Sequence, residues 1–401
     1  MARGTPTPAR QRRLHPLVPA LVAVAVSAVL VAVVAGSGDD EPAAAPASTS
    51  TTTGSTTTAP PPPTTALPDA RPAATLLVAG PDVAAPSAYR ITYEVVENGL
   101  PRVEEWTVRR PYESLVLSTR DGVLLSGTST SRARLQTFLS DEDGWLPIQP
   151  ELHRAAYDQH PASAIGVMEV LGLVERRGEE EHLGRACAVW RTGQPPSAGA
   201  PTPPTDEEHT DVCIDGAGLV LHERWEIGGN VVVERTATAL ELEPAVDPAM
   251  FEPGPVVQDA DALTAAFSTI AVPADDETLG RLQTEVPVPE GYGYDGAVFR
   301  GAGGGPAGGG GPPASAETVR FYSRGADLLE VAEVFTDGGA SLASEAAVRV
   351  DVEGWGEVWF EPGFRMSMLR ARLDDTTYVE VRHHDVPFLF EVLSSLRRVD
   401  R

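Results

Sequence analysis

The sequence predicts an α+β protein that is built mainly from antiparallel strands and lies largely outside a membrane. Three observations predict this class. Most of the chain beyond Ala74 alternates apolar and polar residues, as half-buried strands do. After Pro150 the apolar spacing becomes helical, and the chain ends in an amphipathic segment. Before Ala74, an apolar run is followed by a Ser/Thr/Pro-rich tract that could not build a core.

The N-terminus is predicted to anchor the chain in a membrane. Residues 1–16 form a tail with four arginines and no acid, and residues 17–36 are almost entirely apolar. Such a run can cross a bilayer core of about 30 Å, and the arginines favour a cytoplasmic tail. The alternative is a cleaved signal peptide with Val33 and Ala35 at the cleavage site, but the apolar core exceeds the roughly 7–15 residues usual for one. We expect a single-pass protein of the cell membrane whose main body is extracytoplasmic.

Residues 37–72 form a Ser/Thr/Pro-rich linker, for which we expect disorder. The formal net charge of −26 opposes binding to nucleic acid. Lysine is absent from the chain, which excludes a phosphate-binding P-loop, a lysine Schiff base and a Ser-x-x-Lys acyl-transfer motif.

The first folded unit is predicted over residues 73–256. In "YRITYEVV", from Tyr89, every second residue is apolar, which predicts a half-buried strand. "NGL" at Asn98 and "DG" at Asp121 predict tight turns between consecutive strands. One or two helices are expected after Pro150, followed by further strands up to about residue 243.

The only two cysteines, Cys187 and Cys213, are predicted to form a disulfide. Each lies in a strand pattern, "ACAVW" and "DVCID", and a Pro/Gly/Ala-rich loop joins the two strands. Neighbouring antiparallel strands would bring the cysteines opposite one another, and the extracytoplasmic location permits oxidation. The alternative, a catalytic or metal-binding thiol pair, lacks CxxC spacing.

The second unit is predicted over residues 272–401, as a smaller α+β domain. Its strands alternate strongly, and a closing helix follows. The apolar face of that helix comprises Phe388, Leu389, Val392, Leu393 and Leu396. A Gly-rich insertion at 301–313 contains a literal G-x-G-x-x-G, but prolines stand where a dinucleotide site needs a helix. We therefore expect no nucleotide there.

No catalytic, cofactor-binding or metal-binding constellation is predicted. G-x-S-x-G, HExxH and CxxC are absent from the sequence. His383, His384 and Asp385 could suggest a metal site, but neighbours on a strand point to opposite faces, so a polar cluster at a strand end is the preferred interpretation. "DEDGW", from Asp141, has the acid spacing of a calcium loop without its closing glutamate, and an ordinary acidic turn is expected.

Aromatic residues are spread over the strands of the first unit, and two interpretations of them remain open. They could form the core, or some of them could line an apolar cavity between a curved sheet and its helices. The candidate cavity-lining residues are Tyr89, Tyr93, Trp106, Trp145 and Trp225.

These pieces together resemble a known family. The segments "CIDGAGLVLHERWEIGG" and "LEPAVDPAMFEP" are similar to the strands of the LolA-like fold. The residues that match its pattern are Asp215, Gly218, Leu219, Leu221, Asp247 and Phe251. In the second unit, "VPVPEGYGYDG" and "VRFYSRGADLLEVAEVF" resemble the C-terminal domain of the MucB/RseB type of sigma-E regulatory proteins. The resemblance covers roughly Ala74 to the C-terminus.

The resemblance implies a half-open antiparallel β-barrel with helices, able to hold a lipid or acyl chain, beside a smaller domain. It also implies a non-enzymatic sensor or adaptor that binds an anti-sigma-type membrane protein. The predicted anchor, Arg324 in place of an acid and the Gly-rich insertion depart from the family pattern. A cell-envelope lipid or lipoprotein carrier is the alternative function, and an exported hydrolase is a third.

Overall fold

The computed structural model describes the greater part of the chain beyond residue 68. The described ranges are 69–77, 85–131, 134–140, 144–150, 162–196, 201–254, 270–301, 315–336 and 346–399. The predicted tail and anchor, nearly all of the linker, the acidic residues 141–143 and residues 302–313 of the Gly-rich insertion lie outside them. None of the helices within the described ranges is long and apolar enough to cross a membrane.

The first sheet has eleven strands and one α-helix in the same stretch of chain. The strand order is β7-β6-β5-β4-β3-β2-β12-β11-β10-β9-β8. The bounds are β2 Ala88–Glu97, β3 Leu100–Arg109, β4 Glu113–Arg120, β5 Val123–Thr130, β6 Arg134–Leu139, β7 Gly144–Pro150, α2 Ala162–Val170, β8 Val174–His182, β9 Arg185–Thr192, β10 Glu208–Asp215, β11 Val220–Ile227 and β12 Asn230–Leu242.

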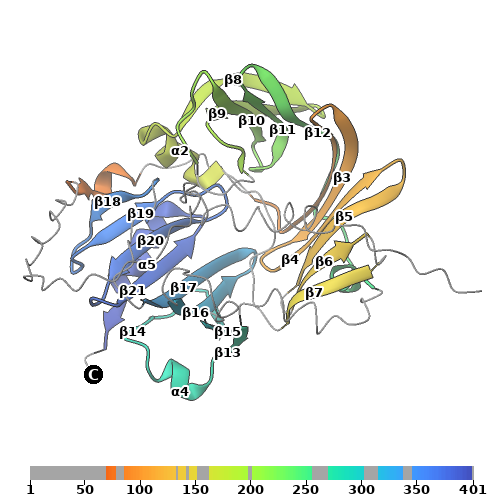
Figure 1. Ribbon diagram of the computed structural model, residues 1–401. Helices are drawn as coiled ribbons and strands as arrows, with labels where there is room; N and C mark the ends of the chain where they lie inside the picture. Colours follow the sequence, from red (N-terminus) through yellow and green to blue (C-terminus); the bar gives the residue numbers. More distant parts are fainter. Residues whose placement is uncertain are drawn as a thin grey trace, which may run out of the picture. The chain divides into compact units, whose positions relative to one another are not determined.

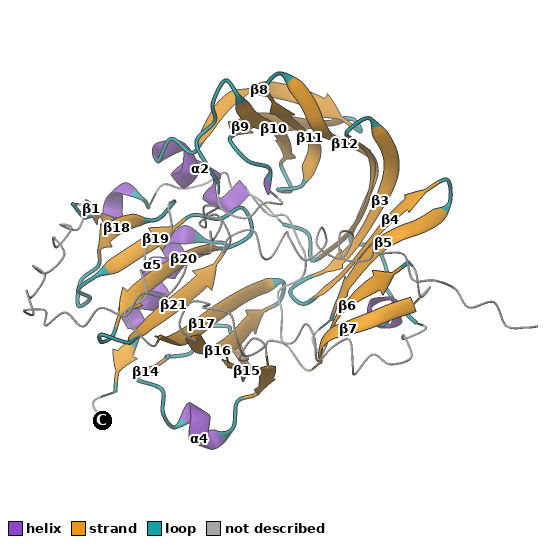
Figure 2. Cartoon of the chain, in the orientation of Figure 1, coloured by secondary structure: helices purple, strands orange, loops and turns teal. Residues whose placement is uncertain are grey.

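This sheet is antiparallel throughout and open, because β7 and β8 stand at opposite ends of the strand order. The two halves of the meander are joined where β12 returns to pair with β2. Register shifts in β12 and β11 mark bulges, which increase local bend and twist, and Figure 2 shows the long strands β3 and β12 bending strongly. The predicted half-open, mainly antiparallel architecture is therefore confirmed for the first unit (Figure 1).

Two of the turns form as their sequences predict. Asn98 and Gly99 both have positive φ, 50° and 77°, between β2 and β3. Asp121 and Gly122 repeat this between β4 and β5, with φ of 52° and 76°. Only Gly, Asn and Asp adopt such angles at low cost, so these dipeptides place the hairpins and the register that follows from them.

The segment after β10 shows why two motif residues stand where they do. Asp215 Oδ1 accepts hydrogen bonds from the backbone N–H groups of Ala217 and Leu219, at 2.9 Å each. Its other oxygen lies 2.6 Å from Arg185 Nη2. Gly218 takes φ of +77° within this turn. The Asp-x-x-Gly-Leu motif thus forms the turn that connects β10 to β11.

The disulfide between Cys187 and Cys213 forms as predicted, with 5.4 Å between the two Cα atoms. It joins the neighbouring strands β9 and β10. The cysteines are not directly opposite one another, since Cys187 pairs with Asp215 and Cys213 pairs with Val189. The bond therefore runs diagonally across the strand pair, and the expectation of directly facing cysteines is wrong in that detail.

The second sheet has nine strands in the order β1-β18-β19-β20-β21-β17-β16-β15-β13. Its strands are β1 Arg71–Pro72, β13 Ile270–Pro273, β15 Gly293–Gly301, β16 Ser315–Arg324, β17 Asp327–Thr336, β18 Val348–Asp351, β19 Val358–Glu361, β20 Ser367–Arg372 and β21 Thr377–His383. The remaining short elements are η1 Ala73–Thr75, η3 Pro248–Phe251, α4 Asp276–Leu279, and the pair β14 Thr284–Glu285 with β22 Arg397–Arg398.

One face of the second sheet is covered by the predicted closing helix, α5, over Val386–Ser395. The helix contacts β20 and β21, and its buried residues include Leu389, Val392 and Leu393. Asp385 is the N-cap, because its carboxylate accepts a hydrogen bond from the Phe388 backbone N–H. The sheet, this helix and the shorter α4 make the second unit an α+β structure, as predicted.

Candidate functional site

The five candidate cavity-lining aromatics do not form one group. Tyr89, Tyr93 and Trp106 belong to one buried cluster and are only 2–3% exposed. Trp145 is buried in a separate cluster, and Trp225 on β11 is half-buried. The structure thus brings three of the five together, on β2 and β3.

Two of these rings pack against a guanidinium that the sequence pattern does not identify. Arg235, on β12, lies with its Cζ 5.5 Å from the ring centroid of Tyr93 and 5.4 Å from that of Trp106. The two rings meet edge to face at 5.7 Å. Trp106 and Tyr93 are both anchored, since Trp106 Nε1 donates to a carboxylate oxygen of Glu104 and Tyr93 Oη donates to the Val220 carbonyl.

Two carboxylates hold the same guanidinium. Arg235 Nη1 lies 3.2 Å from Glu223 Oε2, and Arg235 Nη2 lies 3.4 Å from Glu104 Oε2. Register places these residues on one face of the sheet, because Arg235 pairs with Glu223 on β11 and with Val95 on β2, while Tyr93 pairs with Glu104. We call Glu104, Glu223 and Arg235 the buried charge triad.

The two carboxylates of the buried charge triad have opposite pKa shifts. Burial raises the pKa of Glu223, and the attraction of Arg235 does not offset that effect. Burial also acts to raise the pKa of Glu104, but Arg235 and Arg102 together outweigh it and lower the pKa below its usual value. Arg102 Nη2 lies 2.9 Å from Glu104 Oε1, which explains the difference.

The buried charge triad could have been found from the sequence by one signal. In β3 the inward-facing positions alternate, and Glu104 occupies one of them beside Trp106. A charged residue at an inward position predicts a buried partner of opposite charge. The identity of that partner could not be read from the pattern, because Arg235 is brought beside β2 only by the return of β12.

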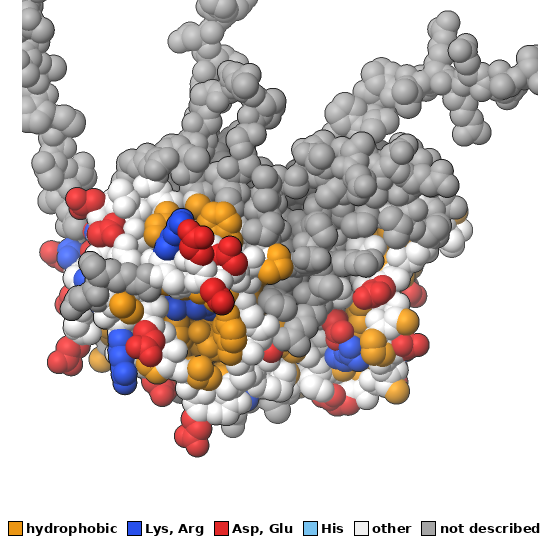
Figure 3. All heavy atoms as spheres, turned by 90° about the horizontal axis from the view of Figure 1, so that it is seen from below, with side chains coloured by type: hydrophobic (Ala, Val, Ile, Leu, Met, Phe, Trp, Pro, Cys, Tyr) orange, Lys and Arg blue, Asp and Glu red, His pale blue; other side chains and the backbone are white. Residues whose placement is uncertain are grey.

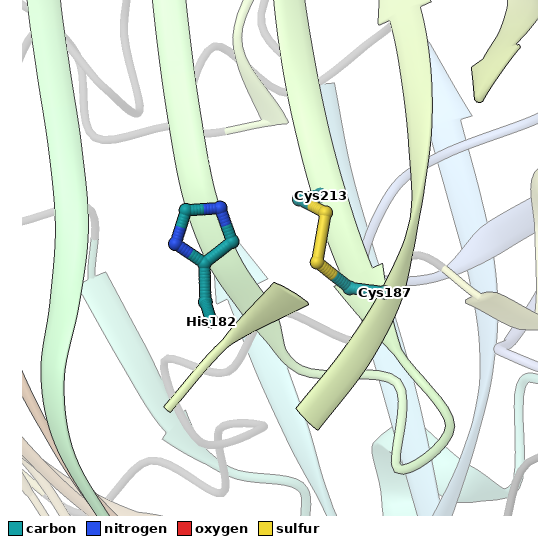
Figure 4. A group of neighbouring side chains, drawn as sticks. All are labelled: His182, Cys187 and Cys213. Carbon is teal, nitrogen blue, oxygen red and sulfur yellow. A yellow bond between two sulfur atoms is a disulfide. The ribbon is translucent and has the colours of Figure 1, made fainter. Parts of the chain in front are cut away.

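A second polar group of interest lies beside the disulfide. Glu180 and His182 on β8 approach His222 on β11, and a donor atom from each lies within 4.8 Å of the other two. His182 also lies within the same distance of the sulfurs of Cys187 and Cys213 (Figure 4). Oxidised sulfurs are not the thiolates that bind metals, so the imidazoles and the carboxylate are the potential metal ligands here.

The group at His383 and His384 differs from its prediction. The two imidazole rings stack with 4.2 Å between centroids, so the expectation that they point to opposite faces is wrong. The reason is that β21 ends at His383 and the chain turns at once into α5. A polar cluster at a strand end does form, because His383 accepts a hydrogen bond from the Asp385 backbone N–H and lies 3.0 Å from Tyr292 Oη.

Arginines of the second sheet are paired with acids across strands. Arg300 lies 2.6 Å from Glu317, and Arg370 lies 2.7 Å from Glu380. Figure 3 shows acidic and basic side chains next to one another, with apolar ones between them, on the face seen there. Charge on these strands is thus neutralised locally rather than gathered into one basic surface.

Solved structures similar to this chain are of the type that the sequence patterns resemble. A crystal structure of MucB is 13% identical, with 81% of this chain and 96% of that chain covered and a TM-score of 0.30. The complex of Pseudomonas aeruginosa MucA and MucB is 15% identical, with 78% and 94% covered and a TM-score of 0.29. An outer membrane lipoprotein-sorting domain from Vibrio parahaemolyticus is 10% identical, with 44% and 91% covered and a TM-score of 0.21.

No family model matches the chain, and no curated protein matches it. At these TM-scores, similarity to the solved structures does not establish a shared activity or partner. The functional inference below therefore depends on the residues of this chain.

Proposed function

We propose that this chain is a non-enzymatic, membrane-tethered adaptor that binds the extracytoplasmic part of an anti-sigma-type membrane protein. The predicted anchor would hold it in the cell membrane, and the predicted linker would extend the two sheets away from the bilayer. That linker is shorter than the predicted 37–72, because Arg71–Pro72 form β1 and pair with β18 in the second sheet. The partner class comes from the resemblance of the sequence to MucB/RseB-type regulators. The solved complex of MucA with MucB is an assembly of the kind proposed.

The observation that supports an adaptor over a carrier is the filled inner face of the first sheet. Tyr89, Tyr93 and Trp106 are at most 3% exposed, and the rings of Tyr93 and Trp106 pack against Arg235. A lipid carrier needs a continuous apolar cavity, whereas this position holds a charged group with two carboxylates. Displacing these side chains to admit an acyl chain would leave the carboxylates buried without their cation, which is costly.

The described residues also favour binding over catalysis. Among them, the buried ionisable groups Glu104, Glu223 and Arg235 form ion pairs between strands, and His383 is hydrogen-bonded to Tyr292. A hydrolase would need a nucleophile and a base within hydrogen-bond reach. The proposed role therefore assigns specificity to the outer surfaces of the sheets.

The test is crosslinking of the full chain in its own membranes, followed by reconstitution with the extracytoplasmic segment of the captured protein. The matched control joins residues 1–68 to an unrelated folded domain, so that anchor and linker are retained and the sheets are lost. Saturable one-to-one binding of a single-pass protein with a cytoplasmic sigma-factor-binding domain, absent from the control, would support the proposal.

Two results would overturn it. Capture of the same proteins by the control would assign the interaction to the anchor or linker. Alternatively, organic extraction of the purified chain could release a defined acylated species in near-stoichiometric amount while no protein partner binds. That result would replace the adaptor with the lipid or lipoprotein carrier.

A further inference from the structure

We propose that Glu180, His182 and His222 form a binding site for a divalent transition-metal ion, with Zn²⁺ as the best-fitting case. We call these three residues the histidine cluster. The site is separate from the buried charge triad and goes beyond the adaptor function proposed above.

The geometry of the histidine cluster converges on one oxygen atom. His182 Nε2 lies 3.0 Å from Glu180 Oε2, and His222 Nδ1 lies 3.7 Å from the same oxygen. The two imidazole rings stack with 5.0 Å between their centroids. A carboxylate oxygen and a ring nitrogen from β8 and a ring nitrogen from β11 therefore surround a single small volume.

These separations suit a tetrahedral ion. With Zn–N and Zn–O bonds of about 2.0–2.2 Å, neighbouring ligand atoms of a tetrahedral site lie roughly 3.3–3.5 Å apart. The separations of 3.0 and 3.7 Å bracket that range, so small side-chain rotations would complete the site. Two imidazoles and one carboxylate form a known zinc ligand set, and three protein ligands leave the fourth position open to water or another molecule.

Glu234 gives His222 the outer contact that metal-binding histidines usually have. Glu234 Oε1 lies 3.4 Å from His222 Nε2, on the opposite side of the ring from Glu180. A neutral imidazole carries one N–H, so a hydrogen bond to Glu234 leaves a lone pair on Nδ1 facing the Glu180 carboxylate. A cation between these two atoms removes that repulsion, and the Glu234 contact would fix the ring orientation.

The disulfide explains how the histidine cluster is held in place. His182 and His222 stand on β8 and β11, and the two strands between them, β9 and β10, are joined by Cys187–Cys213. Glu180 pairs with Cys187 and Cys213 pairs with His222, so the bond runs diagonally from the row of residues that contains Glu180 to the row that contains His222. Figure 4 shows His182 beside the two sulfurs. The covalent link limits how far β8 and β11 can separate.

The two imidazoles are mostly buried, whereas the carboxylate is exposed enough for an ion to reach it from solvent. The side chains of His182 and His222 are 20% and 19% exposed, and that of Glu180 is 48% exposed. The imidazoles are thus oriented by packing, while an ion can enter from the Glu180 side. His209 lies outside the histidine cluster, with its Nε2 3.7 Å from Glu226 Oε2.

The experiment uses untagged, full-length protein in detergent, with the disulfide intact and metals removed by chelator. Zn²⁺ affinity is measured by competition with a chromogenic chelator, and coordination geometry by the visible absorption of bound Co²⁺. We expect one ion per chain. Loss of an outer-shell partner costs about 10–100-fold in metal affinity, so Glu234→Gln should lower the Zn²⁺ affinity by about that factor. His222→Ala and Glu180→Gln each remove a ligand and should lower the Zn²⁺ affinity by at least roughly 100-fold.

His209→Ala is the matched control and should leave the affinity unchanged, since it removes an imidazole beside a glutamate outside the histidine cluster. Glu180 is exposed enough that Glu180→Gln preserves the fold, which keeps the test valid if His222→Ala fails to fold. The proposal is overturned if the oxidised protein retains no Zn²⁺, if Glu180→Gln binds as tightly as the unchanged chain, or if binding requires reduction of Cys187–Cys213.

Discussion

Removal of the Cys187–Cys213 disulfide should destabilise the first sheet far more than the second. The two cysteines are 26 residues apart in sequence. Closing a loop of that length reduces the entropy of the unfolded chain enough to stabilise the fold by about 3.5 kcal/mol at 25 °C. The perturbation is the double substitution Cys187→Ala/Cys213→Ala, which leaves no thiols to re-form the bond.

The assay is hydrogen exchange of backbone amides at increasing urea, because a protein with two large sheets need not unfold in one step. Amides of β9, β10 and β11 should lose protection equivalent to about 3.5 kcal/mol, whereas amides of β16 and β17 should change little. Reduced but unsubstituted protein is the control, since it loses the bond while both side chains remain. A loss below about 1 kcal/mol in β9 and β10 would refute the entropic reasoning. An equal loss in β16 and β17 would instead show that the two sheets unfold together, which would refute the expected difference between them.

Three further substitutions test other parts of the structure. Arg235→Met should cost roughly 3–5 kcal/mol in urea denaturation, because Glu104 and Glu223 would lose their buried cation. Asp385→Ala should cost about 1 kcal/mol in the same assay, since it removes the N-cap of α5. Burial, followed by the charge of a neighbouring imidazole, lowers the folded pKa of His383 well below 6.5. The unfolded chain therefore binds the proton first, and stability should be constant above about pH 7 and fall as pH drops below 6.5, by up to about 1.4 kcal/mol per pH unit. His383→Gln should flatten that slope in unfolding measured from pH 7.5 to 5.

The outcomes that contradict these expectations differ. For Arg235→Met, the matched control is Arg90→Met, which breaks an exposed ion pair with Glu241 and should cost at most about 1 kcal/mol. Equal costs would mean that burial of the triad does not matter. A stability change below about 0.3 kcal/mol for Asp385→Ala would mean that the cap contributes nothing. An unchanged slope in His383→Gln would assign the pH dependence to other histidines.

Local patterns predicted the strands and their turns well for a physical reason. Alternation in "YRITYEVV" indicates which side of one strand is buried. The four apolar residues at alternate positions, from Tyr89 to Val95, are at most 3% exposed, whereas Val96 on the other side is 41% exposed. The dipeptides at Asn98 and Asp121 favour positive φ wherever they occur. Each of these signals acts over a few residues, so no knowledge of distant segments is needed.

The predictions that were wrong concern residues whose positions depend on segments elsewhere in the chain. Trp145, Trp225 and Trp106 are all aromatic residues in predicted strands, and all three were candidates to line one cavity. Trp145 and Trp225 lie apart from the cluster at Tyr93, because the strands that pair decide which side chains meet. The histidines at 383 and 384 were expected to alternate, but the strand ends between them. The residue at which a strand ends depends on how the next element packs. The alternation of residues within one strand carries no information about that packing.

The sequence by itself determined the mainly antiparallel class, the turns, the closing helix and, with only two cysteines present, the disulfide partner. Only the tertiary structure decided that β12 returns beside β2, that Arg235 is enclosed between two carboxylates, and that His182 and His222 converge on Glu180. The physical reason is range. Propensity and periodicity depend on neighbours along the chain, whereas charge pairing and ligand geometry depend on strands that are far apart in sequence and are brought together by the register of the whole sheet.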